Sequence, residues 1–128
     1  MGATLLVTIP LDEGAMLVEE MDKSGFPFVA AFWLYHSEYD KWKLRIATPV
    51  YDDKGPREAY SKIQAVFSQL PESRSIDTTD ITAVGTTDEV VTALRTQFLV
   101  RPGDPVKRVR QTRIDNVRID EAFIYRLI

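Results

Sequence analysis

Cysteine is absent from the 128 residues of this chain, and His36 is its single histidine. Without thiols the chain cannot form disulfides, a thiolate nucleophile, or a zinc or iron–sulfur centre bound by cysteine. A Ser-His-Asp triad would have to use His36 from the end of an expected strand. The glycines lack the spacing of a phosphate-binding loop, and no Gly-x-Ser-x-Gly motif occurs. The sequence therefore contains no motif for catalysis or for a cofactor.

Long hydrophobic runs are absent too. The longest nearly apolar run, residues 26–35, has about half the length that a membrane-spanning helix requires. The first residues, MGATLLVTIP, lack the basic segment of a secretory signal peptide, and their apolar core is too short. We therefore expect a cytoplasmic protein without a membrane segment.

The composition is typical of a globular protein, with 45% hydrophobic and 27% charged residues. A chain of 128 residues is long enough to bury a core without metals or disulfides. Because no linker, repeat or low-complexity tract divides the sequence, we expect a single globular domain over residues 1–128.

Hydrophobic periodicity predicts a chain that mixes strands and helices. The expected strands are residues 4–9, 28–36, 41–51, 81–84, 106–114 and 117–128. The second and third of them are expected to pair as a hairpin around the turn SEYD, and the last two around Asp115-Asn116. The pattern predicts an α+β fold, in which about three helices pack on one mostly antiparallel sheet of five or six strands.

Three segments have apolar residues at helical spacing. The first is expected to be capped by Asp12 and to stop at Gly25. Its predicted apolar stripe is Leu11, Ala15, Val18 and Met21. The second starts with Pro56 in its first turn. The third is expected to follow a capping box formed by Thr86 and Glu89.

Three stretches, WLYHSEYDKWKLRIATPV, KGPREAYSKIQ and the ending FIYRLI, resemble a group of small uncharacterised bacterial proteins of unknown function. The resemblance spans most of the chain. It implies a bacterial, cytoplasmic protein with one domain. Because the stretches are not catalytic motifs, the resemblance implies no activity and no site residues.

The turn of the first hairpin contains potential metal ligands. His36, Glu38 and Asp40 would share one face of a continuing strand and could then bind a metal ion. We expect the turn to separate them, so that His36 is an exposed histidine at the end of a hairpin. The sequence therefore predicts no metal site there.

Asp40, Asp52 and Lys54 also resemble the acidic and lysine residues of metal-dependent nucleases. If residues 41–51 form one strand, about 12 rises of ~3.3 Å place the two aspartates ~40 Å apart, too far to share a magnesium ion. The stretch DDKGP is better explained as a turn whose acidic residues favour the start of the next helix.

Charge is distributed unevenly, although the formal net charge is −3. Residues 101–118 hold six basic residues against two acidic ones, a net charge of +4, whereas residues 12–23 have a net charge of −4. In the predicted second hairpin, Arg110 faces Glu121 and Arg108 lies over Phe123, so part of the basic charge is matched locally.

The tip of this hairpin places Arg113 opposite Arg118. Like charges directly opposite in a ladder destabilise it by up to about 1 kcal/mol. The sequence therefore predicts that Asp115 bridges the two arginines, or that they bind an external anion such as a phosphate backbone.

The first hairpin offers a second surface, because Lys43 and Arg45 are expected to share a face with Phe32, Leu34 and His36. Mixed aromatic and basic side chains can stack single-stranded bases. We favour the alternatives, in which the basic side chains cover an apolar floor or the face docks a second copy or another protein.

Two functional hypotheses follow. The first is a non-enzymatic interaction module that binds a protein partner or itself, through an apolar sheet face or the acidic first helix. The second is a nucleic-acid-binding protein that uses residues 106–118 of the basic hairpin. Its predicted contact residues are Arg101, Lys107, Arg113, Arg118, Lys43 and Arg45. An enzyme ranks third, behind these two hypotheses, because the sequence singles out none of its nineteen acidic residues as catalytic.

Overall fold

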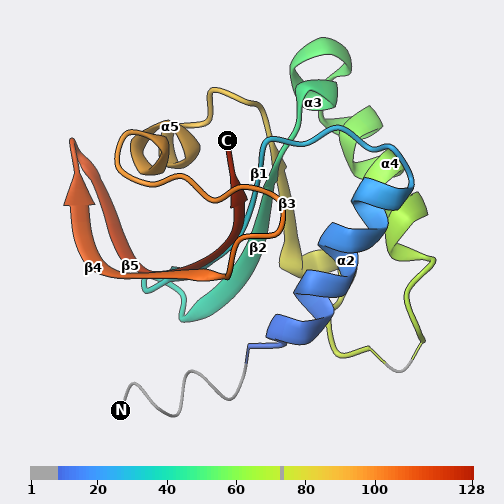
Figure 1. Ribbon diagram of the computed structural model, residues 1–128, viewed down its shortest axis with the longest axis horizontal. Coiled ribbons are helices and arrows are strands. Elements are labelled where there is room, and N and C mark those ends of the chain that lie inside the picture. Colours follow the sequence, from blue (N-terminus) through green and yellow to red (C-terminus); the bar gives the residue numbers. More distant parts are fainter. Residues whose placement is uncertain (1–8, 73) are drawn as a thin grey trace.

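The computed structural model describes residues 9–72 and 74–128, and it has the predicted α+β architecture. Five strands form one open sheet in the spatial order β3-β2-β1-β5-β4 (Figure 1). The strands are β1 (Ala30–His36), β2 (Lys41–Ala47), β3 (Ile81–Val84), β4 (Lys107–Ile114) and β5 (Val117–Leu127). Neighbouring strands are antiparallel, except that β3 runs parallel to β2. Parallel pairing requires a long crossover connection, which here contains two helices.

The helices lie on both faces of the sheet. α2 (Leu11–Lys23) and α4 (Pro56–Phe67) cover one face, and α5 (Glu89–Arg95) lies on the other, within the curve of β4 and β5 (Figure 1). α3 (Pro49–Lys54) leads from β2 into α4, and a 3-10 turn, η1 (Thr78–Asp80), leads into β3. Among the described residues, no helix is long and apolar enough to cross a membrane.

Each face of the sheet has its own hydrophobic core. The first core packs Leu17 and Met21 of α2 and Phe67 of α4 against Trp33 and Ile46 of the sheet. The second core packs α5 and the residues around it against the opposite face, and its buried members include Phe32, Val91, Leu94, Val109, Ile119 and Ile124. β1 and β5 contribute side chains to both cores, which explains why their sequences are apolar almost throughout.

The predicted strand over residues 41–51 is too long, because β2 ends at Ala47. The Thr48 hydroxyl accepts a hydrogen bond from the Val50 N–H at 3.1 Å and caps α3, with Pro49 in the first turn. Local capping therefore outweighs the alternating pattern. The predicted turn in DDKGP is also wrong: its two aspartates are helical, and Gly55, with φ of +91°, joins α3 to α4.

The first helix forms where predicted, but its cap and its buried stripe differ. It begins at Leu11 after Pro10, so Asp12 lies in the first turn and does not cap the helix. The buried positions are Gly14, Leu17 and Met21, and the predicted stripe residue Ala15 is exposed. Gly14 packs directly against Tyr125 and Trp33 of the sheet, so the buried face of the helix runs through Gly14 and Leu17. Gly25, with φ of +74°, follows the end of the helix as expected.

The third helix also forms, but the predicted capping box is wrong. Asp88 is the N-cap of α5 and accepts hydrogen bonds from the N–H groups of Val90 and Val91 at 3.1 and 3.2 Å. Thr86 instead donates its N–H and hydroxyl to the Asp52 carboxylate of α3. Of the predicted strand at residues 4–9, only Ile9 lies within the described residues, and it is buried but outside any strand.

The first hairpin is confirmed. β1 and β2 are joined by the turn SEYD at residues 37–40, with Trp33 opposite Leu44 and Leu34 opposite Lys43. The side chains of Trp33 and Leu44 reach the first core, and Leu34 reaches the second. The faces predicted from alternation are therefore the observed ones.

Candidate binding surface on the C-terminal hairpin

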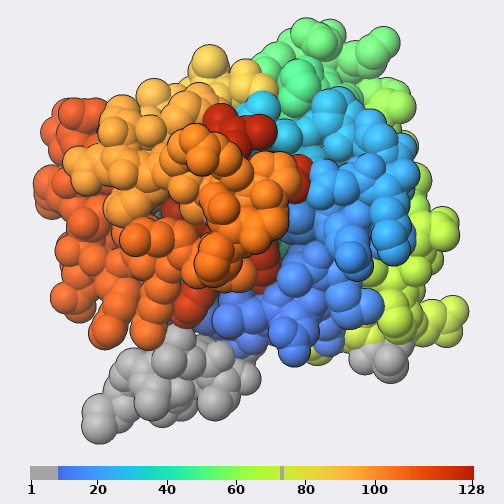
Figure 2. Space-filling model, in the orientation of Figure 1, coloured from blue at the N-terminus to red at the C-terminus, as the bar shows by residue number. Residues whose placement is uncertain are grey.

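β4 and β5 form the predicted second hairpin, with Asp115 and Asn116 as its turn. In Figure 2 the hairpin occupies the left side of the molecule, across from α4. Its register is also the predicted one, so the cross-strand neighbours of the basic residues are known from the pairing. The observed pairs include Arg108 with Phe123, Arg110 with Glu121, and Arg113 with Arg118.

One residue interrupts the regular geometry of β4. Gln111 has φ of +42°, a left-handed conformation that is unusual for a residue with a side chain. Val109 and Ile114 are both buried in the second core, although regular alternation would place residues five apart on opposite faces. The irregularity at Gln111 therefore turns Arg110 and Arg113 toward the same, outer side of the hairpin.

On that side lies a surface hollow of about 650 Å³, which we call the arginine hollow. Tyr35 of β1 forms one border, and the hairpin forms the rest. The lining residues are Tyr35, Arg110, Gln111, Thr112, Arg113, Arg118, Asp120 and Glu121. The hollow thus combines three guanidinium groups with two carboxylates and neutral hydrogen-bonding side chains.

Both carboxylates of the hollow form ion pairs with arginines of the hairpin. Arg108 donates from Nε to Glu121 Oε2 at 2.6 Å, and it lies over the Phe123 ring as predicted, 5.4 Å from the centroid. The predicted ion pair between Arg110 and Glu121 is therefore wrong although the register is right. Diagonal neighbours in a ladder are within reach of long side chains, so Arg108 can bind the buried Glu121 carboxylate instead.

The two arginines at the tip differ in their surroundings. Arg118 donates from Nε to Asp120 Oδ1 at 2.9 Å, and Asp115 forms no ion pair among the described residues. The predicted bridge by Asp115 is thus replaced by a contact along β5. Arg113 and Arg110 are exposed, and neither has an ion-pair partner within residues 9–72 and 74–128.

Two of the predicted contact residues lie away from the hollow. Lys107 places Nζ 5.6 Å from the centroid of the Phe98 ring, which packs against the second core on the α5 side. Arg101 is exposed in the loop before β4, where its N–H donates to the Asp104 carboxylate at 2.7 Å. The structure therefore separates these two residues from Arg113 and Arg118.

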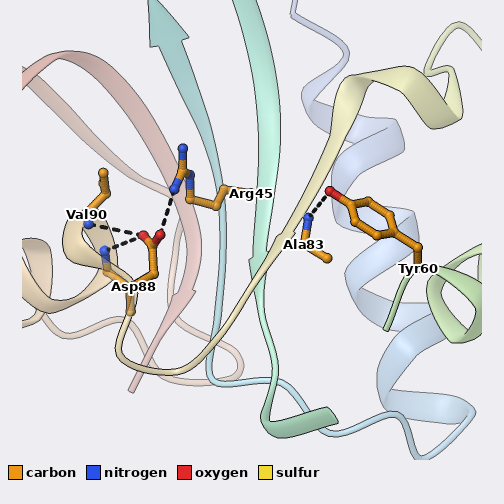
Figure 3. Close-up of polar contacts among 6 residues, drawn as sticks. Arg45, Tyr60, Ala83, Asp88 and Val90 are labelled. Carbon is orange, nitrogen blue, oxygen red and sulfur yellow. Dashed lines mark hydrogen bonds and ion pairs between the residues drawn. The ribbon is translucent and has the colours of Figure 1, made fainter. Parts of the chain in front are cut away.

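Lys43 and Arg45 have partners within the fold. Lys43 Nζ donates to the Thr79 carbonyl at 2.7 Å. Arg45 Nη1 lies 2.9 Å from Asp88 Oδ1, in an ion pair whose side chains are 14% and 16% exposed (Figure 3). These contacts bind both cations within the fold, and neither residue lines the arginine hollow.

Aromatic side chains continue from the hollow along the same face of the sheet. Tyr35 packs on Trp42 with ring centroids 5.3 Å apart, and Trp42 packs on Phe123 at 5.7 Å. The Tyr35 hydroxyl donates to the Asp40 carboxylate, and this hydrogen bond raises the pKa of Tyr35 above its ordinary value. The border of the hollow is therefore a fixed and uncharged aromatic group.

Of the three potential metal ligands of the first turn, His36 and Glu38 lie close together, whereas the Asp40 carboxylate binds the Tyr35 hydroxyl. His36 stacks on Tyr39 with ring centroids 5.1 Å apart, and its Nδ1 lies 3.8 Å from Glu38. Its side chain is only 16% exposed, so the expectation of an exposed histidine is wrong. Burial, together with the nearby charge of Arg45, lowers the pKa of His36. Within the described part of the chain, no group of three or more histidine or acidic residues could bind a metal ion.

Sequence analysis identified Arg113 and Arg118 but missed Arg110 and Tyr35. Arg110 was assigned to the carboxylate opposite it, and only the side-chain positions show that another arginine uses that carboxylate. Tyr35 comes from a distant part of the chain and reaches the hollow through the pairing of β1 with β5. No local pattern in the sequence links it to the hairpin.

Comparison of the chain with protein-family models, curated protein sequences and solved structures found no match. The resemblance to small bacterial proteins therefore stays a prediction.

Proposed function

We propose that this protein is a small non-enzymatic interaction module that binds a protein partner, and that the arginine hollow is its binding surface. One observation supports the proposal most directly: Arg110 and Arg113 border the hollow without an ion-pair partner among the described residues. Such arginines are free to make paired hydrogen bonds to a carboxylate of another molecule. Tyr35 beside them adds a second residue type that is enriched in protein interfaces.

A protein fits this surface better than a polyphosphate does. Asp120 and Glu121 line the hollow together with the arginines, and their ion pairs with Arg118 and Arg108 leave only Arg110 and Arg113 of the hollow unpaired among the described residues, fewer cations than a phosphate backbone usually contacts. Lys43 and Arg45, which the nucleic-acid hypothesis requires nearby, are bound to Thr79 and Asp88. A mixture of charges, with donors and acceptors close together, matches the polar surface of a folded or extended protein segment.

Nucleic-acid binding by residues 106–118 is the second candidate. The observation in its favour is the pair of Arg113 and Arg118 at the hairpin tip, because the Arg118 side chain is 74% exposed. Phosphate groups are the anions that such a pair would bind in a nucleic acid. The sequence resemblance further leads us to propose a bacterial, cytoplasmic setting for either function.

The two candidates can be separated by fluorescence anisotropy. Labelled polyglutamate and labelled single- and double-stranded oligonucleotides are titrated with the protein at low and near-physiological salt. We expect polyglutamate to bind more tightly than the oligonucleotides. The double variant Arg110→Glu, Arg113→Glu should weaken polyglutamate binding about tenfold or more, because hydrogen bonds between charged groups contribute about 1.5–3 kcal/mol each. Its melting temperature should barely change, because both side chains are exposed.

Arg57→Glu is the control for a single charge reversal, half that of the double variant, since Arg57 is an exposed arginine on α4 outside the hollow. It changes the net charge but should leave binding within about twofold of the wild type, the change expected from screened long-range charge alone. Tighter binding of the oligonucleotides, lost in the double variant, would replace the proposed function by the second candidate. Absence of binding by both kinds of ligand at low salt would contradict both candidates.

A further inference from the structure

The two edges of the sheet differ in whether an additional strand could pair with them. β3, at one edge, has only four residues, and its Ala83 N–H donates to the Tyr60 hydroxyl of α4 at 3.0 Å (Figure 3). A side chain from the neighbouring helix therefore occupies a hydrogen-bonding position that another strand would need. This edge is short and partly covered.

β4, at the other edge, has eight residues, and in the described part of the chain it pairs only with β5. Within residues 9–72 and 74–128, no group outside the hairpin forms a hydrogen bond with the backbone of β4. An edge strand directs N–H and C=O groups outward, where they can pair with another extended chain. Among the described residues, β4 is thus the open edge of the sheet, and it borders the arginine hollow.

The side chains of β4 determine which chain could pair with this edge. Lys107, Arg108, Arg110 and Arg113 are exposed on β4, and the strand contains no acidic residue. Two copies of β4 placed side by side would bring these cations together, which disfavours a dimer through this edge. A strand with carboxylates would instead place opposite charges next to each other.

We propose, resting on the function proposed above, that β4 binds an extended acidic segment of a partner protein as an additional strand of the sheet. The backbone of the segment pairs with the open edge, and its carboxylates contact Arg110 and Arg113 at the hollow. The irregular conformation at Gln111, with φ of +42°, limits regular pairing to the short stretches on either side. The partner segment is therefore short, and its charge provides much of the affinity.

The experiment uses labelled peptides of alternating glutamate and valine, which favour an extended chain with carboxylates on one face. A second peptide has the same sequence but N-methyl groups at alternate backbone nitrogens, which removes hydrogen-bond donors and keeps the charge. A third replaces every glutamate by lysine. Binding to the full-length protein is followed by anisotropy, and the protection of backbone amides is followed by hydrogen exchange.

We expect the acidic peptide to bind and the lysine peptide not to bind. The N-methylated peptide should have an affinity lower by about tenfold or more than that of the acidic peptide. Bound acidic peptide should slow hydrogen exchange at outward amides of β4 and leave β3 unchanged. The Arg110→Glu, Arg113→Glu variant should lose this protection, whereas Arg57→Glu should keep it.

Equal binding of the acidic and N-methylated peptides would overturn strand addition while leaving the arginine hollow as the binding surface. Protection of β3 in place of β4 would overturn the assignment of the edge. Failure of every peptide to bind at low salt would contradict the proposed function itself, so the two failures are distinguishable.

Discussion

Gly14 shows how a single residue positions a whole helix. A Cβ atom at this position would lie 2.2 Å from the Tyr125 hydroxyl oxygen and 2.9 Å from Trp33 Nε1. The same hydroxyl accepts a hydrogen bond from Trp33 Nε1 at 3.0 Å and donates one to the Leu11 carbonyl at 2.6 Å. Burial raises the pKa of Tyr125, so the hydroxyl remains protonated and can donate. α2 is therefore bound to the sheet through a buried hydrogen-bonded chain that leaves no room for a side chain.

We predict that Gly14→Ala destabilises the protein by about 1–3 kcal/mol, because the methyl group overpacks this contact. At an exposed helical position the same change would stabilise by about 1 kcal/mol. Equilibrium unfolding in urea measures the difference. The reciprocal change at the exposed neighbour, Ala15→Gly, reports the helical preference alone and should cost about 1 kcal/mol. A more stable Gly14→Ala variant would show that the contact with Tyr125 can open.

At the scale of elements, α5 is stabilised by contacts rather than by its own length. It has seven residues, and a helix this short is marginal in isolation. Asp88 caps its first turn and binds Arg45 of β2, and Arg95 near its end donates from Nε to the Ile128 carbonyl at 3.1 Å. The contacts of Asp88 with β2 and of Arg95 with the residue after β5 thus add to the burial of Val91 and Leu94 in holding this short helix over the second core.

We predict that Asp88→Ala costs about 2–4 kcal/mol, since it removes the cap and leaves the half-buried Arg45 without its partner. Asp88→Asn should cost less, because asparagine also caps helices. Unfolding in urea gives both values, and amide exchange of α5 shows where stability is lost. Thr87→Ala, at an exposed neighbouring position, is the control and should be within about 0.5 kcal/mol of the wild type. Equal costs for the two Asp88 variants would mean that the cap contributes nothing.

At the scale of the whole molecule, one sheet joins two cores. Phe67 belongs to the first core and Leu94 to the second, and both are almost fully buried. β1 and β5 lie in the middle of the sheet and contribute side chains to both sides. Loss of either core would therefore expose the strands on which the other core packs, so we expect the two to unfold together.

We predict that Phe67→Ala costs about 3–5 kcal/mol and that Leu94→Ala costs about 2–5 kcal/mol. Both should shift one common transition. Tryptophan fluorescence tests this, because Trp33 belongs to the first core and yet should report the Leu94 substitution on the opposite face. Val106→Ala, at a 45% exposed position, should leave the transition nearly unchanged. A Leu94→Ala variant with an unshifted tryptophan transition would show that the second core unfolds separately.

The sequence alone determined the features that depend on neighbours along the chain. Alternation and turn residues placed both hairpins and the register of β4 with β5, because a shift by one residue would exchange buried and exposed side chains. Helical spacing located three of the helices for the same local reason. The short helix α3 was missed, because Thr48 and Val50 continue the alternating pattern of β2.

Only the tertiary structure decided which groups meet across the chain. Glu121 binds Arg108 and not Arg110, which is directly opposite it. Arg45 binds Asp88, and Tyr35 lies beside the hairpin. These contacts depend on side-chain positions after folding. Access to the two sheet edges was decided in the same way: the Tyr60 hydroxyl of α4 binds an N–H group of β3, whereas no described residue outside the hairpin pairs with β4. Ion pairs and edges depend on distances in space, and periodicity along the chain contains no information about them.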